Sequence, residues 1–341
     1  MKLHVDIFPL KLRHTFTISR ESSDVVNTVI VGLEHEGITG YGEASPSSYY
    51  EHTAESVSGT LRKNAGLIEA LDPFRYRHAL DGLLSALDGD RAALCAIDTA
   101  LMDWLGKRLG APLSHVLGVD PALSPQSSFT IGISAIDHMQ EKARQAAKFP
   151  ILKIKLGTDD DLAIMRGLRQ ATSATFRVDA NCAWTAQETI EKSRELKQLG
   201  VEFIEQPLPR EELEAMEEVF QKSALPVIAD ESSIVPEDVP GLVGRFHGIN
   251  IKLVKCGGLL PALRMVELAK TYGLKLMVGC MIESSVAISA AAQIAPLLDY
   301  LDLDGAILTS NDPYNGVSVV DGTLVFPDRP GHGAMPRGDC P

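Results

Sequence analysis

The fold is decided by residues 151–210, which read ILKIKLGTDDDLAIMRGLRQATSATFRVDANCAWTAQETIEKSRELKQLGVEFIEQPLPR. Three short apolar segments, 152–156, 176–178 and 201–204, are separated by two stretches with the apolar spacing of amphipathic helices. Strands of this length that alternate with helices form parallel β/α units. The stretch therefore predicts three parallel strands joined by helices.

The same alternation continues on both sides of this stretch, at intervals of roughly 25 residues, which is about the length of one β/α unit. It gives eight predicted strands, at 129–133, 152–156, 176–178, 201–204, 227–229, 249–253, 274–278 and 301–303. Because eight is the strand number of a TIM barrel, we predict an α/β fold with a modified TIM barrel, (β/α)7β, over residues 119–310.

The segments that flank the barrel have a different pattern. Residues 1–118 begin with strand-like alternation and continue with a helix at 91–109, which indicates a small α+β domain. Residues 311–341 contain a hairpin signal, with strands at 317–320 and 323–326 around an Asp-Gly turn. This C-terminal segment is too short for another β/α unit, and we expect it to return to the N-terminal domain.

Composition narrows the classes of function. Of the 341 residues, 45% are hydrophobic, and the formal net charge is -13 without any basic run. This charge argues against nucleic acid or an anionic membrane as partner, and favours a small ligand that carries a cationic group. The five cysteines lack metal-binding spacing, and neither a signal-peptide core nor an apolar run of about 18 residues is present. We expect a soluble, cytoplasmic protein with reduced thiols.

Ionisable residues occur at or near the C-terminal ends of predicted strands 2 to 6: Lys153, Lys155, Asp179, Glu205, Asp230 and Lys252. Active sites of β/α barrels lie at this face of the barrel. A single residue of this kind could be a solvated residue at the barrel rim. Six of them at equivalent positions in their strands indicate an active site.

The carboxylates of Asp179, Glu205 and Asp230 follow three adjacent predicted strands and are expected to converge. Bare anions repel one another, whereas a hard divalent cation prefers oxygen ligands, so we predict a Mg²⁺ site. The alternative is that each carboxylate pairs with a nearby cation, as Arg177 would allow for Asp179.

The lysines of predicted strands 2 and 6, Lys155 and Lys252, are expected to face each other across the barrel mouth, because these strands are four apart in a ring of eight. This is the arrangement of two bases on opposite faces of one carbon. Lys153 supplies a like charge that would lower the pKa of a neighbouring amine, as a base requires. Together with a metal-stabilised enediolate, these residues describe a 1,1-proton transfer.

Five motifs, LKIKLG, RVDANCAW, FIEQPLP, PVIADES and INIKLVKCGG, together resemble the muconate lactonising subgroup of the enolase superfamily. The resemblance implies that residues 1–118 form a capping domain, that the three carboxylates are Mg²⁺ ligands, and that the two facing lysines are the acid/base pair. It also implies a homo-oligomer. Lys255, on a continued strand, would point opposite to Lys252.

Predicted strand 8, YLDLDGA, carries Asp302 and Asp304 on one face, opposite predicted strand 4 and the metal site. Two carboxylates there could hold a substrate ammonium while the metal holds a carboxylate, which describes an extended dipeptide. This DxD pattern resembles that of the dipeptide epimerases, including the L-Ala-D/L-Glu epimerases. The alternative is that the two Asp residues cap a helix or bond loop amides.

Other substrate-binding positions follow from the resemblance. Arg20, in TFTISRESS, matches the position where Ala-Glu epimerases carry an arginine for the glutamate carboxylate, a role that suits its bidentate fork. The alternative is an ordinary solvated arginine. We also expect the substrate pocket to include Lys153, Thr130, Cys280, Met281 and Ile282.

The sequence thus predicts a Mg²⁺-dependent dipeptide epimerase that inverts the α-carbon of the C-terminal residue. The alternative, an o-succinylbenzoate synthase or N-succinylamino acid racemase, shares the lysines and metal ligands but needs no ammonium clamp. Muconate cycloisomerisation is disfavoured because a dianionic substrate would meet Asp302 and Asp304, and a non-catalytic relative would not need all five chemical positions. The natural dipeptide, the physiological direction and the oligomeric state stay open.

Overall fold

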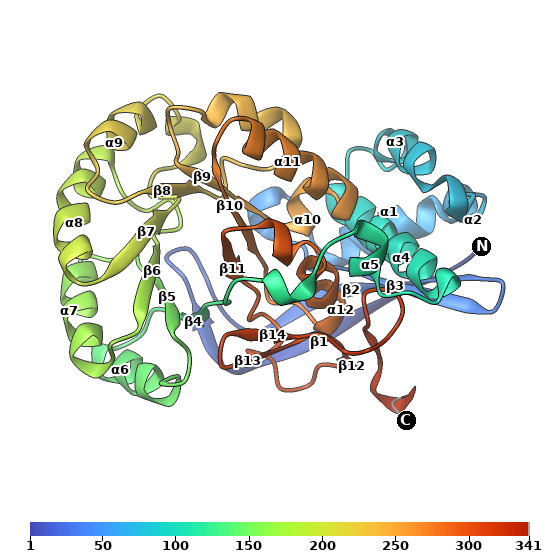
Figure 1. Ribbon diagram of the computed structural model, residues 1–341, viewed down its shortest axis with the longest axis horizontal. Helices are drawn as coiled ribbons and strands as arrows, with labels where there is room; N and C mark the ends of the chain where they lie inside the picture. Colours follow the sequence, from blue (N-terminus) through green and yellow to red (C-terminus); the bar gives the residue numbers. More distant parts are fainter. Residues whose placement is uncertain (340–341) are drawn as a thin grey trace.

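The computed structural model describes residues 1–339 and contains a nearly closed barrel of eight parallel strands (Figure 1). The strands are hydrogen-bonded in chain order, and the Ser128 N–H donates to the Leu301 carbonyl at 3.1 Å, which joins the first strand to the last. The predicted (β/α)7β barrel is confirmed. Its strands are β4 (Phe129–Ile131), β5 (Ile151–Lys155), β6 (Thr175–Asp179), β7 (Val201–Glu205), β8 (Val227–Ala229), β9 (Gly248–Ile251), β10 (Lys275–Gly279) and β11 (Tyr300–Asp302).

Helices pack on the outside of the barrel and connect its strands (Figure 1). The connection between β8 and β9 differs from the others: it is a 3-10 helix, η5 (Pro236–Leu242), in which Pro240 has no N–H to donate. The remaining connections contain α6 (Ile136–Gln145), α7 (Asp161–Ala171), α8 (Ala186–Gln198), η4 (Arg210–Glu212), α9 (Met216–Lys222), α10 (Leu253–Cys256), α11 (Leu259–Thr271), α12 (Ser285–Ala292) and η6 (Ala295–Leu297).

The N-terminal part is a three-stranded antiparallel sheet that packs on a long buried helix. Helix α4 (Arg91–Leu109) has the bounds predicted from the sequence, and β3 lies directly on it, because a Cβ at Gly42 would come within 2.0 Å of the Ala96 carbonyl oxygen. The other elements are β1 (Lys2–Thr17), β2 (Ser22–His35), β3 (Ile38–Ala44), η1 (Ser48–Tyr50), α1 (Ala54–Lys63), α2 (Ala65–Glu69), η2 (Pro73–Arg75), α3 (Tyr76–Ala86), α5 (Leu113–Leu117) and η3 (Pro121–Leu123).

The C-terminal segment contacts both parts of the molecule. The predicted hairpin is confirmed, and the Gly322 carbonyl in its turn accepts a hydrogen bond from Ser127, just before β4. Farther along, the His332 N–H donates to Asp103 of α4 at 3.0 Å. On these contacts we propose the division into 1–118, 119–310 and 311–341, of which 340–341 lie outside the described residues. The segment contains β12 (Tyr314–Asn315), β13 (Ser318–Val320), β14 (Thr323–Val325), β15 (Met335–Pro336) and η7 (Arg337–Asp339).

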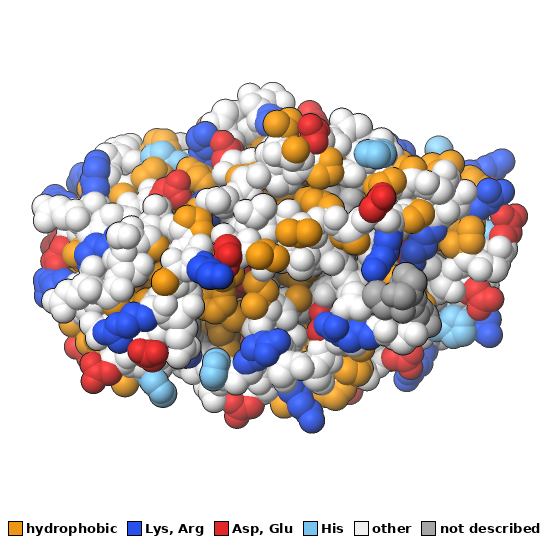
Figure 2. All heavy atoms as spheres, turned by 60° about the horizontal axis from the view of Figure 1, so that its bottom comes forward, with side chains coloured by type: hydrophobic (Ala, Val, Ile, Leu, Met, Phe, Trp, Pro, Cys, Tyr) orange, Lys and Arg blue, Asp and Glu red, His pale blue; other side chains and the backbone are white. Residues whose placement is uncertain are grey.

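The molecular surface carries charges of both signs. On the face shown in Figure 2, cationic and anionic side chains are interspersed, and hydrophobic side chains gather in a hollow near its middle. Across residues 1–339, no helix is both long enough and apolar enough to cross a membrane. The cysteines at positions 95, 182, 256 and 280 are free thiols, and Cys340 lies outside the described residues.

Candidate active site

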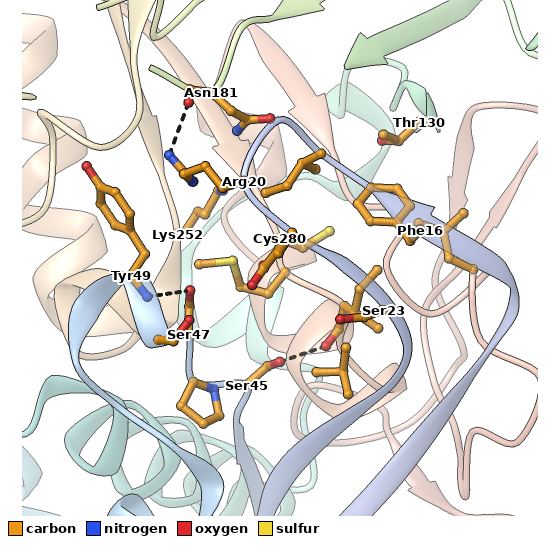
Figure 3. Close-up of a pocket in the computed structure, with 18 of the residues that line it drawn as sticks. Phe16, Arg20, Ser23, Ser45, Ser47, Tyr49, Thr130, Asn181, Lys252 and Cys280 are labelled. Carbon is orange, nitrogen blue, oxygen red and sulfur yellow. Dashed lines mark hydrogen bonds between the residues drawn. The ribbon is translucent and has the colours of Figure 1, made fainter. Parts of the chain in front are cut away.

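A cavity of about 280 Å³ lies at the C-terminal ends of the barrel strands, and the N-terminal domain closes one side of it (Figure 3). The closing segments are the end of β1 with the turn that follows it, residues 23–27 at the start of β2, and residues 45–50 after β3. The residues predicted from the sequence that line this cavity are Arg20, Thr130, Lys155, Asp230, Lys252, Cys280, Met281, Ile282, Asp302 and Asp304. The other predicted residues are buried behind them: Lys153 contacts Asp302, Asp179 contacts Lys155, and Glu205 lies beside Asp230.

Asp179, Glu205 and Asp230 form a buried cluster in which one carboxylate oxygen of each lies within 4.8 Å of the others. The sheet register explains the cluster, because Asp179 and Glu205 are paired residues of β6 and β7, and Asp230 follows β8 directly. Burial and the charges of the other two carboxylates raise the pKa of Glu205 to about 7. Converging oxygen donors of this kind fit a hard divalent cation, so the cluster could hold a metal ion.

Lys153 is enclosed by the carboxylates. Its Nζ atom lies 2.8 Å from Asp302, 2.8 Å from Glu205 and 3.2 Å from Asp179, and the residue is 1% exposed. Burial lowers the pKa of Lys153, but these carboxylates raise it more, so the amine stays charged. Lys153 is not among the residues that line the cavity, so its contact with a substrate stays a prediction.

The pairing of Asp179 with Arg177, which the sequence left open, does not occur. Arg177 donates to Glu202 through Nε and to the Leu301 carbonyl through Nη1, both at 2.9 Å. The cationic groups beside Asp179 are lysines instead.

Lys155 and Lys252 both reach the cavity from strand ends that are four strands apart. Lys155 ends β5 and donates to Asp179 at 2.7 Å, whereas Lys252 follows β9 and donates to Asp230 at 2.8 Å. Burial lowers the pKa of Lys252, but the negative charge of Asp230 raises this pKa by more than burial lowers it, so the net shift is upward. The two amines therefore sit at the cavity with one carboxylate partner each.

The expectation that Lys255 points away from Lys252 is wrong. The chain turns into α10 immediately after Lys252, so the alternation of a strand does not apply to residues 253–256. Lys255 is buried, and its Nζ atom donates to Asp230 Oδ1 at 2.5 Å and to the Ser233 carbonyl at 2.9 Å. Asp230 thus lies between two lysines.

Asp302 and Asp304 line the cavity beside β4, and Lys153 joins Asp302 to the carboxylate cluster. Asp302 accepts a hydrogen bond from the Ser128 hydroxyl at 2.7 Å, and Asp304 accepts one from the Thr130 N–H at 2.6 Å. Burial and the charge of Asp302 raise the pKa of Asp304 to about 7. The sequence left open that Asp304 accepts a hydrogen bond from a loop amide, and it does so from Thr130. This hydrogen bond leaves the carboxylate at the cavity wall.

Arg20 lies on the turn between β1 and β2 and is tied to the barrel. It donates to Glu231 at 2.9 Å and to the Asn181 carbonyl at 3.2 Å, and it lies over the Tyr49 ring (Figure 3). Its side chain is 33% exposed. It is therefore not an ordinary solvated arginine, although an arginine has more N–H donors than these two bonds use.

Several lining residues were missed by sequence reasoning. Asn181 and Glu231 belong to the DAN and DES motifs, so the sequence could predict that they lie beside the carboxylate cluster. The sequence could not predict that both contact Arg20. Tyr49 and Tyr50 carry no signal, because only the docking of the N-terminal domain brings residues 45–50 over the barrel.

The fold and site together define a capped β/α-barrel enzyme with a buried carboxylate cluster between two lysines. Residues 138–339 match the family described as enolase C-terminal domain-like, and residues 3–118 match the N-terminal domain of the mandelate racemase and muconate lactonizing enzymes. The chain belongs to this mandelate racemase and muconate lactonizing family of the enolase superfamily.

Individual relatives narrow the class. The chain is 49% identical over 336 residues to the L-Ala-D/L-amino acid epimerase of Maribacter sp., with 98% of both chains covered. It is 44% identical to the L-Ala-D/L-Glu epimerase of Bacteroides thetaiotaomicron, over 98% of this chain and 88% of that one. The crystal structure of a dipeptide epimerase from Enterococcus faecalis, complexed with Mg and L-Leu-L-Tyr, matches with a TM-score of 0.93 and 32% identity over 98% of both chains. These relatives show that the chain is an isomerase of the epimerase class.

Proposed function

We propose that the protein is a Mg²⁺-dependent dipeptide epimerase that inverts the α-carbon of the C-terminal residue of a dipeptide such as L-Ala-D/L-Glu. The supporting observation is the layout of one cavity, in which two lysines reach the substrate space from strand ends four apart, and Asp302 and Asp304 form an anionic wall where β11 meets β4. A dipeptide fits this layout, because its ammonium and its carboxylate are at opposite ends and the acidic α-carbon adjoins the carboxylate.

The proton transfers fall to the two lysines. One of Lys155 and Lys252, as the free amine, would take the α-proton from one face, and the other, as the ammonium, would deliver a proton to the opposite face. Their carboxylate partners, Asp179 and Asp230, fix the direction of each Nζ atom. Since removal and delivery use opposite faces, the α-carbon is inverted.

The carboxylates of Asp179, Glu205 and Asp230 would hold the Mg²⁺. When bound, Mg²⁺ would neutralise the negative charge that develops on the substrate carboxylate as the α-proton leaves. Lys153 has a separate role: its fixed charge lets Asp302 and the cluster share a small volume without mutual repulsion.

The identity of the C-terminal side chain is the part of the proposal that depends on Arg20. Its guanidinium lines the cavity and retains N–H donors beyond those given to Glu231 and Asn181, so a substrate carboxylate could share it. We propose on this basis that dipeptides with a C-terminal acidic residue are among the substrates.

The alternative, an o-succinylbenzoate synthase or N-succinylamino acid racemase, makes no use of an ammonium clamp. Asp304→Asn separates the two functions cleanly, because an asparagine can still accept the Thr130 N–H bond while it loses the charge. Dipeptide turnover should fall steeply in this variant, whereas turnover of an N-succinylamino acid would persist if the alternative were correct.

The first experiment is proton exchange in D₂O with Mg²⁺ and a dipeptide library, read by mass spectrometry. We expect a gain of about one mass unit in dipeptides that exchange the α-proton, and loss of this exchange when EDTA removes the metal. Absence of exchange with every dipeptide, together with turnover of an N-succinylamino acid, would reject the proposal in favour of the alternative.

We also propose, from the family resemblance, that the protein is a homo-oligomer. Sedimentation equilibrium at several concentrations tests this, and a mass equal to that of one chain at all of them would contradict it.

A further inference from the structure

A second cavity, of about 200 Å³, lies next to the active-site cavity and is called the side groove below. Four residues line both spaces, Leu12, Phe16, Thr130 and Leu308. The other lining residues combine the apolar side chains of Phe129, Ala146, Phe149 and Ile307 with Gly132 and the polar residues Arg13, His14, Thr15, Lys142 and Gln145. The two cavities are therefore neighbours that a few shared side chains separate.

The path of β1 creates this groove. The ladder between β1 and β2 is irregular between Lys11 and Phe16, where β1 leaves its partner and rests on the barrel rim. There the Arg13 N–H donates to the Leu308 carbonyl, and the Thr17 carbonyl accepts from the Ile133 N–H, both at 2.9 Å. The groove is the space enclosed between this stretch of β1, the end of β4 and helix α6.

Thr130 connects the groove to the proposed chemistry. Its N–H donates to Asp304, which the proposed function assigns to the substrate ammonium. The α-carbon of the N-terminal residue is one bond from that ammonium, so its side chain must start beside Thr130. The Phe16 ring lies next to Thr130 in Figure 3, and a Cβ on Gly132 would be 3.5 Å from it, so the ring packs over the end of β4.

We propose that Phe16 separates the side groove from the active-site cavity, so that the side chain of the N-terminal residue cannot enter the groove and this residue is restricted to alanine or others of similar size. This inference rests on the proposed function. A cavity of about 150 Å³ is enough to hold benzene. The groove therefore has room for a leucine or phenylalanine side chain once the Phe16 ring is removed.

The side groove also has a positively charged residue on its wall. This charge allows an experiment to detect whether a substrate side chain enters the groove. Lys142 of α6 lines it and is half-buried, and within residues 1–339 its side-chain amine forms no ion pair or hydrogen bond. This amine would repel a cationic side chain in the groove but not an apolar one.

The test compares kcat/KM for L-Leu-L-X and L-Ala-L-X, where X is the C-terminal residue that the wild-type enzyme converts fastest. We expect the wild type to prefer L-Ala-L-X, and Phe16→Ala to raise the Leu/Ala ratio about tenfold or more. L-Lys-L-X should gain much less than L-Leu-L-X in this variant, and Lys142→Met in the same background should remove that difference.

Phe149→Ala is the matched control. Phe149 borders the side groove but not the active-site cavity, so its removal enlarges the groove without opening it and should leave the Leu/Ala ratio unchanged. The inference is overturned if Phe16→Ala leaves the ratio unchanged, if leucine and lysine gain equally, or if the wild type already accepts both N-terminal residues equally. The inference is also overturned if the wild type epimerises other dipeptides but none with an N-terminal alanine. If the wild type epimerises no dipeptide at all, the proposed function itself fails.

Discussion

The floor of the cavity and its capped side are built in different ways. On the floor, charged side chains such as Asp179 and Lys153 are 0–1% exposed and are held by partners within 3.2 Å on neighbouring strands. On the capped side, Arg20, Phe16 and Tyr49 come from two separate segments and are only partly buried. The comparison teaches that the barrel register fixes the reactive groups, whereas the docked N-terminal domain shapes the space for the substrate. Changes in the floor should alter all reactions, and changes in the cap should alter which substrate is accepted.

The largest effect is expected from the two lysines of the floor. Lys155→Ala and Lys252→Ala should each reduce epimerisation by about 10²–10⁴-fold, because each removes one of the two proton-transfer groups. In D₂O each variant should still exchange the α-proton of one of the two substrate epimers. Lys155→Ala and Lys252→Ala should act on different epimers. If both variants retained exchange of the same epimer, the assignment of opposite faces would be wrong.

The next effect concerns the stability of the floor. In the absence of Mg²⁺, Lys255→Met should lower the free energy of unfolding by about 3–5 kcal/mol, because it leaves Asp230 and buried carbonyls without this partner. Urea denaturation measures the change. The control is Lys63→Met, which breaks an exposed ion pair with Asp88 and should have little effect, as surface pairs usually do. Equal losses in both variants would contradict the contrast between buried and exposed charges.

The pH dependence sharpens the comparison at the anionic wall. Because burial and Asp302 raise the pKa of Asp304 to about 7, this carboxyl is mostly protonated below that pH and cannot pair with an ammonium. We therefore expect kcat/KM for a dipeptide to rise as the pH increases through 7, and to fall above about 8, where the α-amino group of the substrate loses its proton.

The Asp304→Asn variant should have a lower kcat/KM than the wild type at every pH, and its kcat/KM should lack the rise near pH 7. An unchanged acid limb in this variant would assign that limb to another group, such as Glu205, whose pKa is also raised to about 7.

The smallest effect is expected on the capped side. Arg20→Met should reduce kcat/KM for L-Ala-L-Glu about tenfold relative to L-Ala-L-Leu, because only the acidic side chain uses the guanidinium. Arg20→Lys keeps the positive charge but loses the two parallel N–H donors of a guanidinium. Its ratio of kcat/KM for L-Ala-L-Glu over L-Ala-L-Leu should therefore lie between those of the wild type and Arg20→Met. An equal loss for both dipeptides would mean that Arg20 serves to hold the turn on the barrel through Glu231 rather than to select the substrate.

The sequence predicted the barrel strands to within about two residues, because strand and helix periodicity are local properties. It failed at Lys255, where a short helical turn after β9 redirects the side chain toward Asp230. It also gave no signal for Phe16 or Tyr49, because their contacts with the barrel join residues more than 100 positions apart. Such contacts depend on how two domains dock, which no local pattern encodes.

The sequence by itself determined which chemical groups reach the mouth of the barrel, because the two-residue period of a strand and the roughly 25-residue period of the β/α units place them. Only the tertiary structure decided the surroundings of each group. Lys153 became an internal counter-ion because Asp302 and Glu205 reach it from other strands, and Asp304 acquired a raised pKa because the closed barrel buries it beside Asp302. Charge, burial and access depend on these distant neighbours, so they exist only after the barrel closes and the cap is in place.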